Sequence, residues 1–341
     1  MKILVTEVEE WEKKSFQTLM EQHDVVFTDK PLNKELAEEY RDAKVVCPFI
    51  YSSLNAQELQ SFSELKLIAT RSTGFDHIDS DYCTEHDITI CNVPSYGKNT
   101  VAEHVFGLLL TISHNLHEAL NRTRRGDFSM SDLQGFDLQG KTLGVVGTGE
   151  IGQCVISIAK GFGMRVLAFD VDPDQEVAQQ LGFSYVELEK LLGDSDIVTL
   201  HVPANKQNRH MISTEQFLSM REGGVLINTS RGSIVDVQAL LRALTEGRLL
   251  AAGLDVLPEE PTIREEAELL RTLYKEEHDQ QTLLADHILL RLNNVYITPH
   301  SAFNTREAVQ RILDTSVQNI AGFIADQSQN VVVNQSGKAN S

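Results

Sequence analysis

Short apolar runs are spread along the whole chain, and stretches with helical spacing separate them. Ten runs are rich in β-branched residues: ILVT from 3, VVCPF from 45, LIAT from 67, ITICNV from 88, LGVVGTG from 143, RVLAFD from 165, DIVTLHV from 196, GVLINTS from 224, AAGLDV from 251 and VYIT from 295. Strands that are apolar throughout and alternate with helices are typical of parallel sheets covered on both faces. The pattern therefore predicts a doubly wound α/β fold.

A helix-rich stretch from about Thr100 to Arg125 divides the first four runs from the last six. Asn99 and Thr100 are both candidate caps, and the apolar positions 101, 105, 108, 109 and 112 keep helical spacing. We interpret this stretch as a spine between two domains, each built around its own parallel sheet.

The chain after His300 is expected to return to the first domain. An amphipathic helix over REAVQRILDTSVQNIAGFIAD and the short run NVVV follow it, and the last residues, NQSGKANS, are expected to be loose. We therefore expect a first domain of residues 1–99 and 299–334, a second domain of residues 100–298, and a flexible tail of residues 335–341.

Composition narrows the classes of partner and location. The 341 residues carry a formal net charge of -19, which argues against nucleic acid or anionic membrane, since both need clustered Lys and Arg. No apolar run approaches the roughly 18 residues of a membrane span. The start, MKILVTEVEE, leaves no room for a signal peptide. Cys47, Cys83, Cys91 and Cys154 lack metal-type spacing, so we expect reduced thiols, no metal site and a cytoplasmic protein.

A glycine-rich motif lies between a predicted strand and a predicted helix. GVVGTGEIGQ has the form GxGxxG at Gly147, Gly149 and Gly152, where glycines allow a tight turn, close approach of a pyrophosphate and close helix packing. The amino end of the helix then faces the diphosphate. Asp170, 18 residues after Gly152, ends the next strand and is placed to accept hydrogen bonds from a ribose. The alternative is an ordinary turn with a solvated Asp. The predicted strand before the motif and the predicted helix after it favour NAD binding instead.

Four residues whose side chains can take part in binding or catalysis follow predicted strands: His201, Arg231, Asp255 and His300. Because ligands of open α/β sheets bind beyond the carboxyl ends of the strands, we expect these side chains to converge on one crevice. A guanidinium offers two parallel donors to a carboxylate, which suits Arg231. An imidazole exchanges a proton near neutral pH, which suits His300.

A carboxylate is needed to orient the imidazole of His300 and to favour its charged form. Glu259 and Glu260, in LPEEP, are both candidates. A packing role for His300 and a surface role for Arg231 are the alternatives. We interpret His104, His77 and His210 as capping or packing residues, and His201 as lining the adenine side of the coenzyme.

With the glycine motif, Asp170, NTSRG, LDVLPEEP and TPHSAF in this order, the chain resembles the NAD-dependent D-isomer-specific 2-hydroxyacid dehydrogenases, from about residue 40 to 330. The resemblance implies that the second domain is a Rossmann-type NAD domain and that the first is a smaller, flavodoxin-like substrate domain. It implies catalytic roles for Arg231, Glu260 and His300, and it places Asp255 near the nicotinamide.

The resemblance also implies the ligand contacts. RSTGFDHID resembles the loop whose amides hold the substrate carboxylate, which indicates Thr73 and Gly74. Tyr96 and Phe303 correspond to active-site aromatic residues, and with NVPSYGKNTVAEH they are most similar to the D-lactate dehydrogenase branch. The residues expected to contact NAD are Gly147, Thr148, Gly149, Glu150, Ile151, Gly152, Asp170, His201, Val202, Pro203, Thr229, Ser230 and Asp255.

The activity that the resemblance implies is reduction of a 2-keto acid, pyruvate first, by NADH, in a homodimer joined through the spine. The alternatives are a glyoxylate or hydroxypyruvate reductase, a phosphoglycerate dehydrogenase, for which Arg71 is a candidate phosphate ligand, and an NAD-responsive corepressor-like binding protein. Two features depart from the family. Glu150 in the glycine loop is expected to face solvent or pair locally, and an acidic insertion at 262–292 has no assigned role.

Overall fold

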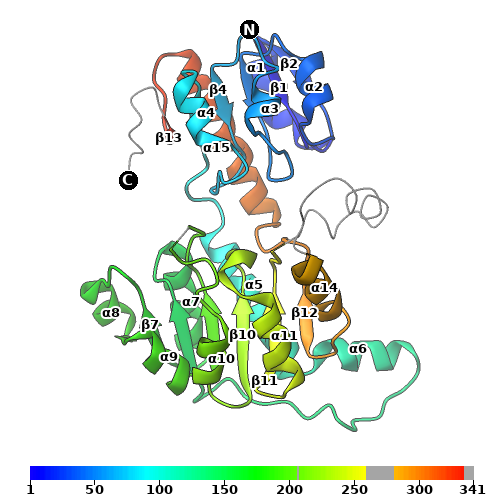
Figure 1. The fold of residues 1–341 in the computed structure, drawn as a ribbon, viewed down its shortest axis with the longest axis vertical. Helices are drawn as coiled ribbons and strands as arrows, with labels where there is room; N and C mark the ends of the chain where they lie inside the picture. Colours follow the sequence, from blue (N-terminus) through cyan, green and yellow to red (C-terminus); the bar gives the residue numbers. More distant parts are fainter. Residues whose placement is uncertain (206, 259–279, 334–341) are drawn as a thin grey trace. The chain divides into compact units, whose positions relative to one another are not determined.

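The computed structural model describes residues 1–205, 207–258 and 280–333, and the chain forms two compact units (Figure 1). The first unit combines Met1–Tyr96 with Thr305–Ser341, and the second is the continuous segment Gly97–Asn304. The tail expected at 335–341 lies outside the described residues. The assignment of substrate to one unit and coenzyme to the other stays a prediction.

The first unit contains a six-stranded sheet in the order β13-β5-β4-β3-β1-β2. Its strands are β1 (Lys2–Val5), β2 (Asp24–Phe27), β3 (Val45–Cys47), β4 (Leu67–Ala69), β5 (Thr89–Cys91) and β13 (Val331–Val333). All pairs are parallel except β13 with β5, which is antiparallel. The parallel strands follow the order 2-1-3-4-5, which is the flavodoxin-like order that the resemblance implies. The inner strands β3 and β4 are buried throughout, as their continuous apolar runs require.

The helices of the first unit are η1 (Lys13–Phe16), α1 (Gln17–Met20), α2 (Lys34–Glu39), α3 (Ala56–Leu59), α4 (Ser80–Glu85) and α15 (Arg306–Ile324). Side chains cap four of them, because Asn33, Asn55, Asp79 and Thr305 each accept a hydrogen bond from a first-turn N–H group. Short polar residues directly before apolar stretches therefore determine where these helices begin.

The second unit contains a seven-stranded sheet in the order β12-β11-β10-β9-β6-β7-β8. Its strands are β6 (Thr142–Val146), β7 (Arg165–Phe169), β8 (Ser184–Tyr185), β9 (Ile197–Leu200), β10 (Gly224–Asn228), β11 (Leu249–Leu254) and β12 (Val295–Ile297). Every pair is parallel. Counted from β6, the order is 3-2-1-4-5-6 with one further strand, so the predicted Rossmann-type fold is confirmed.

Helices cover both faces of the second sheet (Figure 1). The helices of this unit are α5 (Lys98–Ser113), α6 (Leu116–Arg124), α7 (Glu150–Gly161), α8 (Gln175–Leu181), α9 (Leu188–Asp194), α10 (Thr214–Ser219), η2 (Gly232–Ile234), α11 (Val237–Thr245) and α14 (Gln280–Leu289). Leu191, Phe217 and Leu240 bring α9, α10 and α11 into one apolar core. Val105 and Val155 bring α5 and α7 into the other. The unit is therefore doubly wound.

The helix-rich stretch expected from about 100 to 125 consists of two helices, α5 and α6. Asn115 separates them with a left-handed backbone, φ 49°, which Asn tolerates better than most residues. Its Nδ2 donates to the carbonyl oxygens of Leu133 and Gln134 at 3.3 and 3.2 Å, and these bonds favour the turn. No helix within the described residues is long and apolar enough to cross a membrane.

The four cysteines are free thiols, and Cys47, Cys83 and Cys91 are buried in the first unit. Burial raises the pKa of Cys47 to about 12, so its thiol stays protonated at neutral pH. These thiols therefore act as small apolar packing groups.

Candidate active site

The glycine loop joins β6 to α7, and two of its glycines are required by backbone contacts. Gly147 has φ 95°, and a Cβ at this position would lie 2.7 Å from the carbonyl oxygen of His201. A Cβ at Gly152 would lie 2.1 Å from the carbonyl oxygen of Gly147. Gly149 differs, because a Cβ there would meet no atom within 4 Å. The middle glycine therefore leaves open space beside the backbone, which fits the approach of a pyrophosphate.

The amino end of α7 has the properties of an anion site. Gly149 is the N-cap and has no side chain to accept hydrogen bonds from the first turn, whose N–H groups need a partner. The carboxylate of Glu150, in the first turn of α7, is paired with a cation and does not add an unpaired negative charge to this anion site. Its Oε1 lies 3.4 Å from the Nζ of Lys98, and both side chains are about half exposed. The local pairing expected for Glu150 is thus observed.

Asp170 follows β7 and is bound to the glycine loop. Its Oδ2 accepts from the backbone N–H of Thr148 at 2.6 Å and from the Thr148 hydroxyl at 2.8 Å, and its Oδ1 accepts from the N–H of Asp172 at 3.1 Å. Burial raises the pKa of the Asp170 carboxyl, but the hydrogen bonds from Thr148 and Asp172 outweigh it, so the pKa is lowered overall. Asp170 is therefore an anion at neutral pH.

Tyr185 belongs to the same network, and the sequence did not indicate it. Its hydroxyl lies 2.8 Å from the Oγ1 of Thr148, and it accepts from the N–H of Asp174 at 3.3 Å. Because the Thr148 hydroxyl donates to Asp170, Tyr185 must donate to Thr148. Tyr185 lies on the two-residue strand β8, which has no apolar run that would have revealed it.

His201 follows β9 and is unsuited to acid catalysis. Its Nε2 lies 3.0 Å from the Oγ1 of Thr199, and its backbone N–H donates to the carbonyl of Val146. Burial of the imidazole lowers the pKa of His201 to about 3, although the residue as a whole is partly exposed. The ring is therefore neutral at physiological pH, in accord with the expected lining role beside Val202 and Pro203.

Asp255 follows β11 and holds the turn that carries His300. Its Oδ1 accepts from the Thr298 hydroxyl at 2.5 Å and from the N–H of Ser301 at 2.9 Å, and its Oδ2 accepts from the N–H of Ala302 at 2.9 Å. Its backbone carbonyl accepts from the N–H of His300 at 3.0 Å. Asp255 is only 1% exposed, and protein donors satisfy both of its carboxylate oxygens.

His300 has a backbone conformation that needs such support. Its φ is 51°, in the left-handed region that costs a non-glycine residue of order 1 kcal/mol. A further contact comes from α5, where the Nε2 of His104 lies 3.0 Å from the Thr298 hydroxyl and 3.5 Å from the Oδ1 of Asp255. His104 was interpreted as a structural residue, and this contact agrees with that interpretation.

The Arg231 loop is connected to the same edge of the sheet. The Nδ2 of Asn228, at the end of β10, donates to the carbonyl of Arg231 at 3.0 Å, and the N–H of Asp255 donates to the carbonyl of Asn228 at 2.9 Å. A Cβ at Gly232 would lie 2.2 Å from the carbonyl carbon of Leu257, so the loop packs directly on the chain that follows Asp255. Arg231, Asp255 and His300 thus follow three neighbouring strands, β10, β11 and β12.

The predicted orienting carboxylate, Glu260, and its alternative, Glu259, lie outside the described residues, as does most of the acidic insertion. Thr229 and Ser230, expected to contact the coenzyme, lie in the Arg231 loop, where Ser230 donates twice to the Oδ1 of Asn228. Phe303 is half-buried directly after the His300 turn.

In the first unit, the loop after β4 has two backbone donors to offer. The hydroxyl of Thr73 donates to the carbonyl of Val93 at 2.7 Å, and Asn92 Nδ2 donates to the carbonyl of Thr73 at 2.8 Å. The backbone N–H groups of Thr73 and Gly74 make no hydrogen bond to any described residue. Two such donors can bind a carboxylate, which is the role that the resemblance implies for Thr73 and Gly74 and which stays a prediction. Tyr96, in the same unit, is half-buried, and its carbonyl accepts from Arg311 Nε at 2.6 Å.

The chain is similar to known proteins in both sequence and fold. Residues 106–302 match the family model of the D-isomer specific 2-hydroxyacid dehydrogenase, NAD binding domain. The chain is 35% identical to the D-lactate dehydrogenase of Escherichia coli over 95% of this chain and 97% of that protein. It is 34% identical to the glyoxylate reductase of Korarchaeum cryptofilum over 89% of this chain and 87% of that protein. The structure of D-lactate dehydrogenase from Aquifex aeolicus, complexed with NAD and lactic acid, matches with a TM-score of 0.84, 35% identity and coverage of 95% and 96%.

Proposed function

Because the chain belongs to the D-isomer specific 2-hydroxyacid dehydrogenases, which are NAD-dependent oxidoreductases, we propose that it is a D-lactate dehydrogenase that reduces pyruvate with NADH. The observation that carries the proposal is the turn of His300. Four hydrogen bonds to Asp255 hold an imidazole at the carboxyl end of β12, two strands from the Arg231 loop. An acid after β12 and a guanidinium after β10, at the same edge of the sheet, suit reduction of a 2-keto acid.

In the proposed mechanism, the substrate carboxylate binds the N–H groups of Thr73 and Gly74 and the guanidinium of Arg231. Arg231 also polarises the keto oxygen. NADH supplies the hydride that reduces C2. His300 donates its proton to the oxygen as negative charge develops there, and Glu260 favours the charged imidazolium. Tyr96 and Phe303 line the substrate site.

Coenzyme binding is assigned to the second unit. The uncapped amino end of α7 and the open side of Gly149 support a diphosphate site on Thr148, Glu150 and Ile151. We assign Asp170 to the ribose and His201, Val202, Pro203, Thr229 and Ser230 to the rest of the coenzyme. Asp255, expected near the nicotinamide, is given a positioning role, because its carboxylate is already occupied by the His300 turn.

The substrate alternatives differ in the support they have. Similarity to a glyoxylate reductase keeps glyoxylate and hydroxypyruvate as second candidates. A phosphoglycerate substrate is disfavoured, because Arg71, the candidate phosphate ligand, is 2% exposed and binds Thr6, Glu7 and Glu12. The corepressor-like binding protein is the candidate of a different class.

Steady-state oxidation of NADH by the purified chain separates these candidates. The panel is pyruvate, hydroxypyruvate, glyoxylate, phenylpyruvate and 2-ketoglutarate. The proposal expects the highest kcat/KM with pyruvate and D-lactate as the product. If the chain prefers glyoxylate or hydroxypyruvate, the proposed substrate is wrong but the enzyme class stands. If it turns over none of the five compounds, the corepressor-like binding protein becomes the favoured candidate.

We also propose a homodimer and a cytoplasmic location. Leu116 and Leu120 on α6, together with Phe128 and Met130 after it, are apolar side chains between 43% and 85% exposed. Exposed apolar side chains that lie this close together in the sequence suit burial against a second copy of the chain. The molar mass from light scattering tests the dimer, and Phe128→Ser with Met130→Ser is expected to weaken it. The location rests on the reduced cysteines and the sequence alone.

A further inference from the structure

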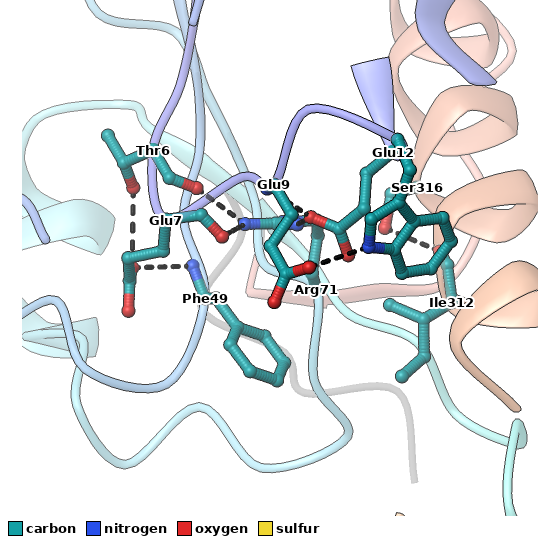
Figure 2. A network of polar contacts seen from close by, with 9 residues as sticks. Thr6, Glu7, Glu9, Glu12, Phe49, Arg71, Ile312 and Ser316 are labelled. Carbon is teal, nitrogen blue, oxygen red and sulfur yellow. Dashed lines mark hydrogen bonds and ion pairs between the residues drawn. The ribbon is translucent and has the colours of Figure 1, made fainter. Parts of the chain in front are cut away.

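A buried guanidinium lies directly before the loop that carries Thr73 and Gly74. Arg71 is 2% exposed, and its Nη2 donates to the carbonyl oxygens of Thr6 at 2.5 Å and Glu7 at 2.7 Å. Its Nη1 lies 3.3 Å from the Oε2 of Glu12 (Figure 2). One side chain therefore joins the carboxyl end of β4 to the chain that follows β1.

Arg71 also contacts the loop after β3. Its guanidinium carbon lies 5.4 Å from the centre of the Phe49 ring, and its backbone N–H donates to the carbonyl of Pro48 at 2.9 Å. A guanidinium at this distance from an aromatic ring makes a favourable cation–π contact. Three loops at one edge of the first sheet are thus held by a single residue.

The side chain of Glu7 also joins the chain that follows β1 to the loop after β3. Its carboxylate accepts from the backbone N–H of Phe49 at 2.9 Å and of Tyr51 at 2.7 Å, and also from the hydroxyl of Ser52. Its φ is 54°, a left-handed conformation that persists in proteins only where the surroundings enforce it. Such strain is more common at functional sites than in ordinary surface loops.

The buried charge is hard to explain by stability alone. Burying an ion pair loses hydration energy that the attraction between the charges often only offsets, and an apolar pair of similar volume is often as stable. The Arg71–Glu12 pair, with exposed side-chain fractions of 2% and 10%, is of this kind. A hydrogen-bonded ion pair does, however, hold backbone groups in one geometry. Here the two amides of Thr73 and Gly74 follow Arg71 by two and three residues.

We infer that Arg71, held by Glu12, is a positioning residue that sets the N–H groups of Thr73 and Gly74 for the carboxylate of the substrate. The inference rests on the proposed function, because it assigns those amides to a 2-keto acid. Arg71 acts from within the first unit, so its loss changes substrate binding and leaves coenzyme binding intact. A purely structural role would lower stability without this selectivity.

The test compares Arg71→Met with Arg248→Met. Arg248 is the matched control, since its guanidinium also donates to backbone carbonyls, those of Phe217, Leu218 and Met220. It lies in the second unit directly before β11, at the opposite end of that strand from Asp255. We expect Arg71→Met to raise KM for pyruvate and the inhibition constant of oxamate, a pyruvate isostere, at least tenfold. The kcat and the Kd for NADH are expected to change less than threefold. Arg248→Met is expected to lower the melting temperature without changing KM.

Glu12→Gln is the second variant, in case Arg71→Met does not fold. It keeps an acceptor for Arg71 but removes the charge, and we expect a KM increase of at least threefold, again without a change in NADH binding. Wild-type KM and oxamate inhibition in a folded Arg71→Met or Glu12→Gln protein would overturn the inference. So would an equal loss of NADH affinity.

Failure of the inference differs from failure of the proposed function. If the wild type prefers glyoxylate to pyruvate, the same comparison is made with glyoxylate, because the inference concerns the carboxylate common to all these substrates. If the wild type neither reduces a 2-keto acid nor binds oxamate, the proposed function and the inference fall together. An active wild type with insensitive variants overturns the inference alone.

Discussion

Thr148 donates two hydrogen bonds to the same oxygen of Asp170, from its backbone N–H at 2.6 Å and from its hydroxyl at 2.8 Å. The carboxylate assigned to the ribose is therefore also the anchor of the glycine loop. Tyr185 orients the Thr148 hydroxyl from the other side, at 2.8 Å. The geometry of the glycine loop thus depends on one hydrogen-bonded chain of three side chains, and so does the coenzyme preference that we propose for Asp170.

Asp170→Ala is expected to narrow the preference for NADH over NADPH at least tenfold, because it removes both the ribose acceptor and the charge that repels a phosphate. Thr148→Val keeps the backbone hydrogen bond and loses the hydroxyl, which costs about 1 kcal/mol, and its effect on the preference is expected to be smaller. Ratios of kcat/KM for the two coenzymes measure this. An unchanged ratio in Asp170→Ala would assign ribose recognition to another residue.

Asp255→Asn is expected to lower kcat at least tenfold, because an amide cannot accept all the hydrogen bonds that Thr298, Ser301 and Ala302 donate. Binding of NADH, followed by fluorescence, is expected to persist. Asp196→Asn is a suitable control. Asp196 accepts from the N–H of Thr142 at 2.8 Å at the amino ends of the strands, on the edge of the sheet opposite His300. If Asp255→Asn and Asp196→Asn lower kcat equally, the loss in Asp255→Asn reflects lower stability of the unit and not the position of His300.

Gly149→Ala and Gly152→Ala separate coenzyme binding from folding. At Gly149 the added methyl meets no protein atom within 4 Å, so the melting temperature is expected to stay unchanged while the Kd for NADH rises. At Gly152 the methyl would lie 2.1 Å from a backbone oxygen, and a loss of stability of about 2 kcal/mol is expected from overpacking. Calorimetry and NADH titration of both variants check this. Normal NADH affinity in Gly149→Ala would place the pyrophosphate elsewhere.

Arg231→Lys keeps the charge but loses the planar pair of donors, so a loss of about 2 kcal/mol in kcat/KM is expected. The loss is measured by steady-state kinetics with the best 2-keto acid of the panel. Arg221→Lys is the control, because Arg221 is about half exposed and pairs with Asp196 at the opposite edge of the sheet. Kinetics of Arg231→Lys as close to wild type as those of the control would remove Arg231 from the site.

His201 makes the fold sensitive to acid. Burial lowers its pKa from 6.5 to about 3, so between these values the unfolded chain binds a proton that the folded chain does not. The lowered pKa of His201 therefore reduces the free energy of unfolding progressively as the pH falls below 6.5, and it has no effect above that value. His201→Gln is expected to flatten the loss of unfolding free energy between pH 6.5 and 4.5, measured by urea denaturation. Identical pH profiles for the two proteins would contradict this.

The central strands could be predicted from the sequence because their residues are buried on both faces. Strand β2 was missed because its residues, DVVF, are only half-buried at the sheet edge, and β8 because it has two residues. Asn115 divides the expected helix-rich stretch into α5 and α6 with a backbone conformation that periodicity cannot reveal.

The placement of Arg231, Asp255 and His300 was predictable from strand ends, because parallel strands bring the residues after them to one edge of the sheet. The supporting contacts were not, since they join residues distant in the chain. Arg71 and Glu12 are 59 positions apart, and Tyr185 is 37 positions from Thr148. The acceptor role of Asp255 likewise depends on how a loop 46 residues later is folded.

Strand β13 pairs with β5, although the whole second unit separates them in sequence. During synthesis on the ribosome, a chain that has emerged as far as Asn304 contains all seven strands of the second sheet but lacks the sixth strand of the first. Until α15 and β13 emerge, β5 is an open edge that can pair with another chain. Premature termination after Asn304 would therefore yield an aggregation-prone product whose NAD-binding half is complete.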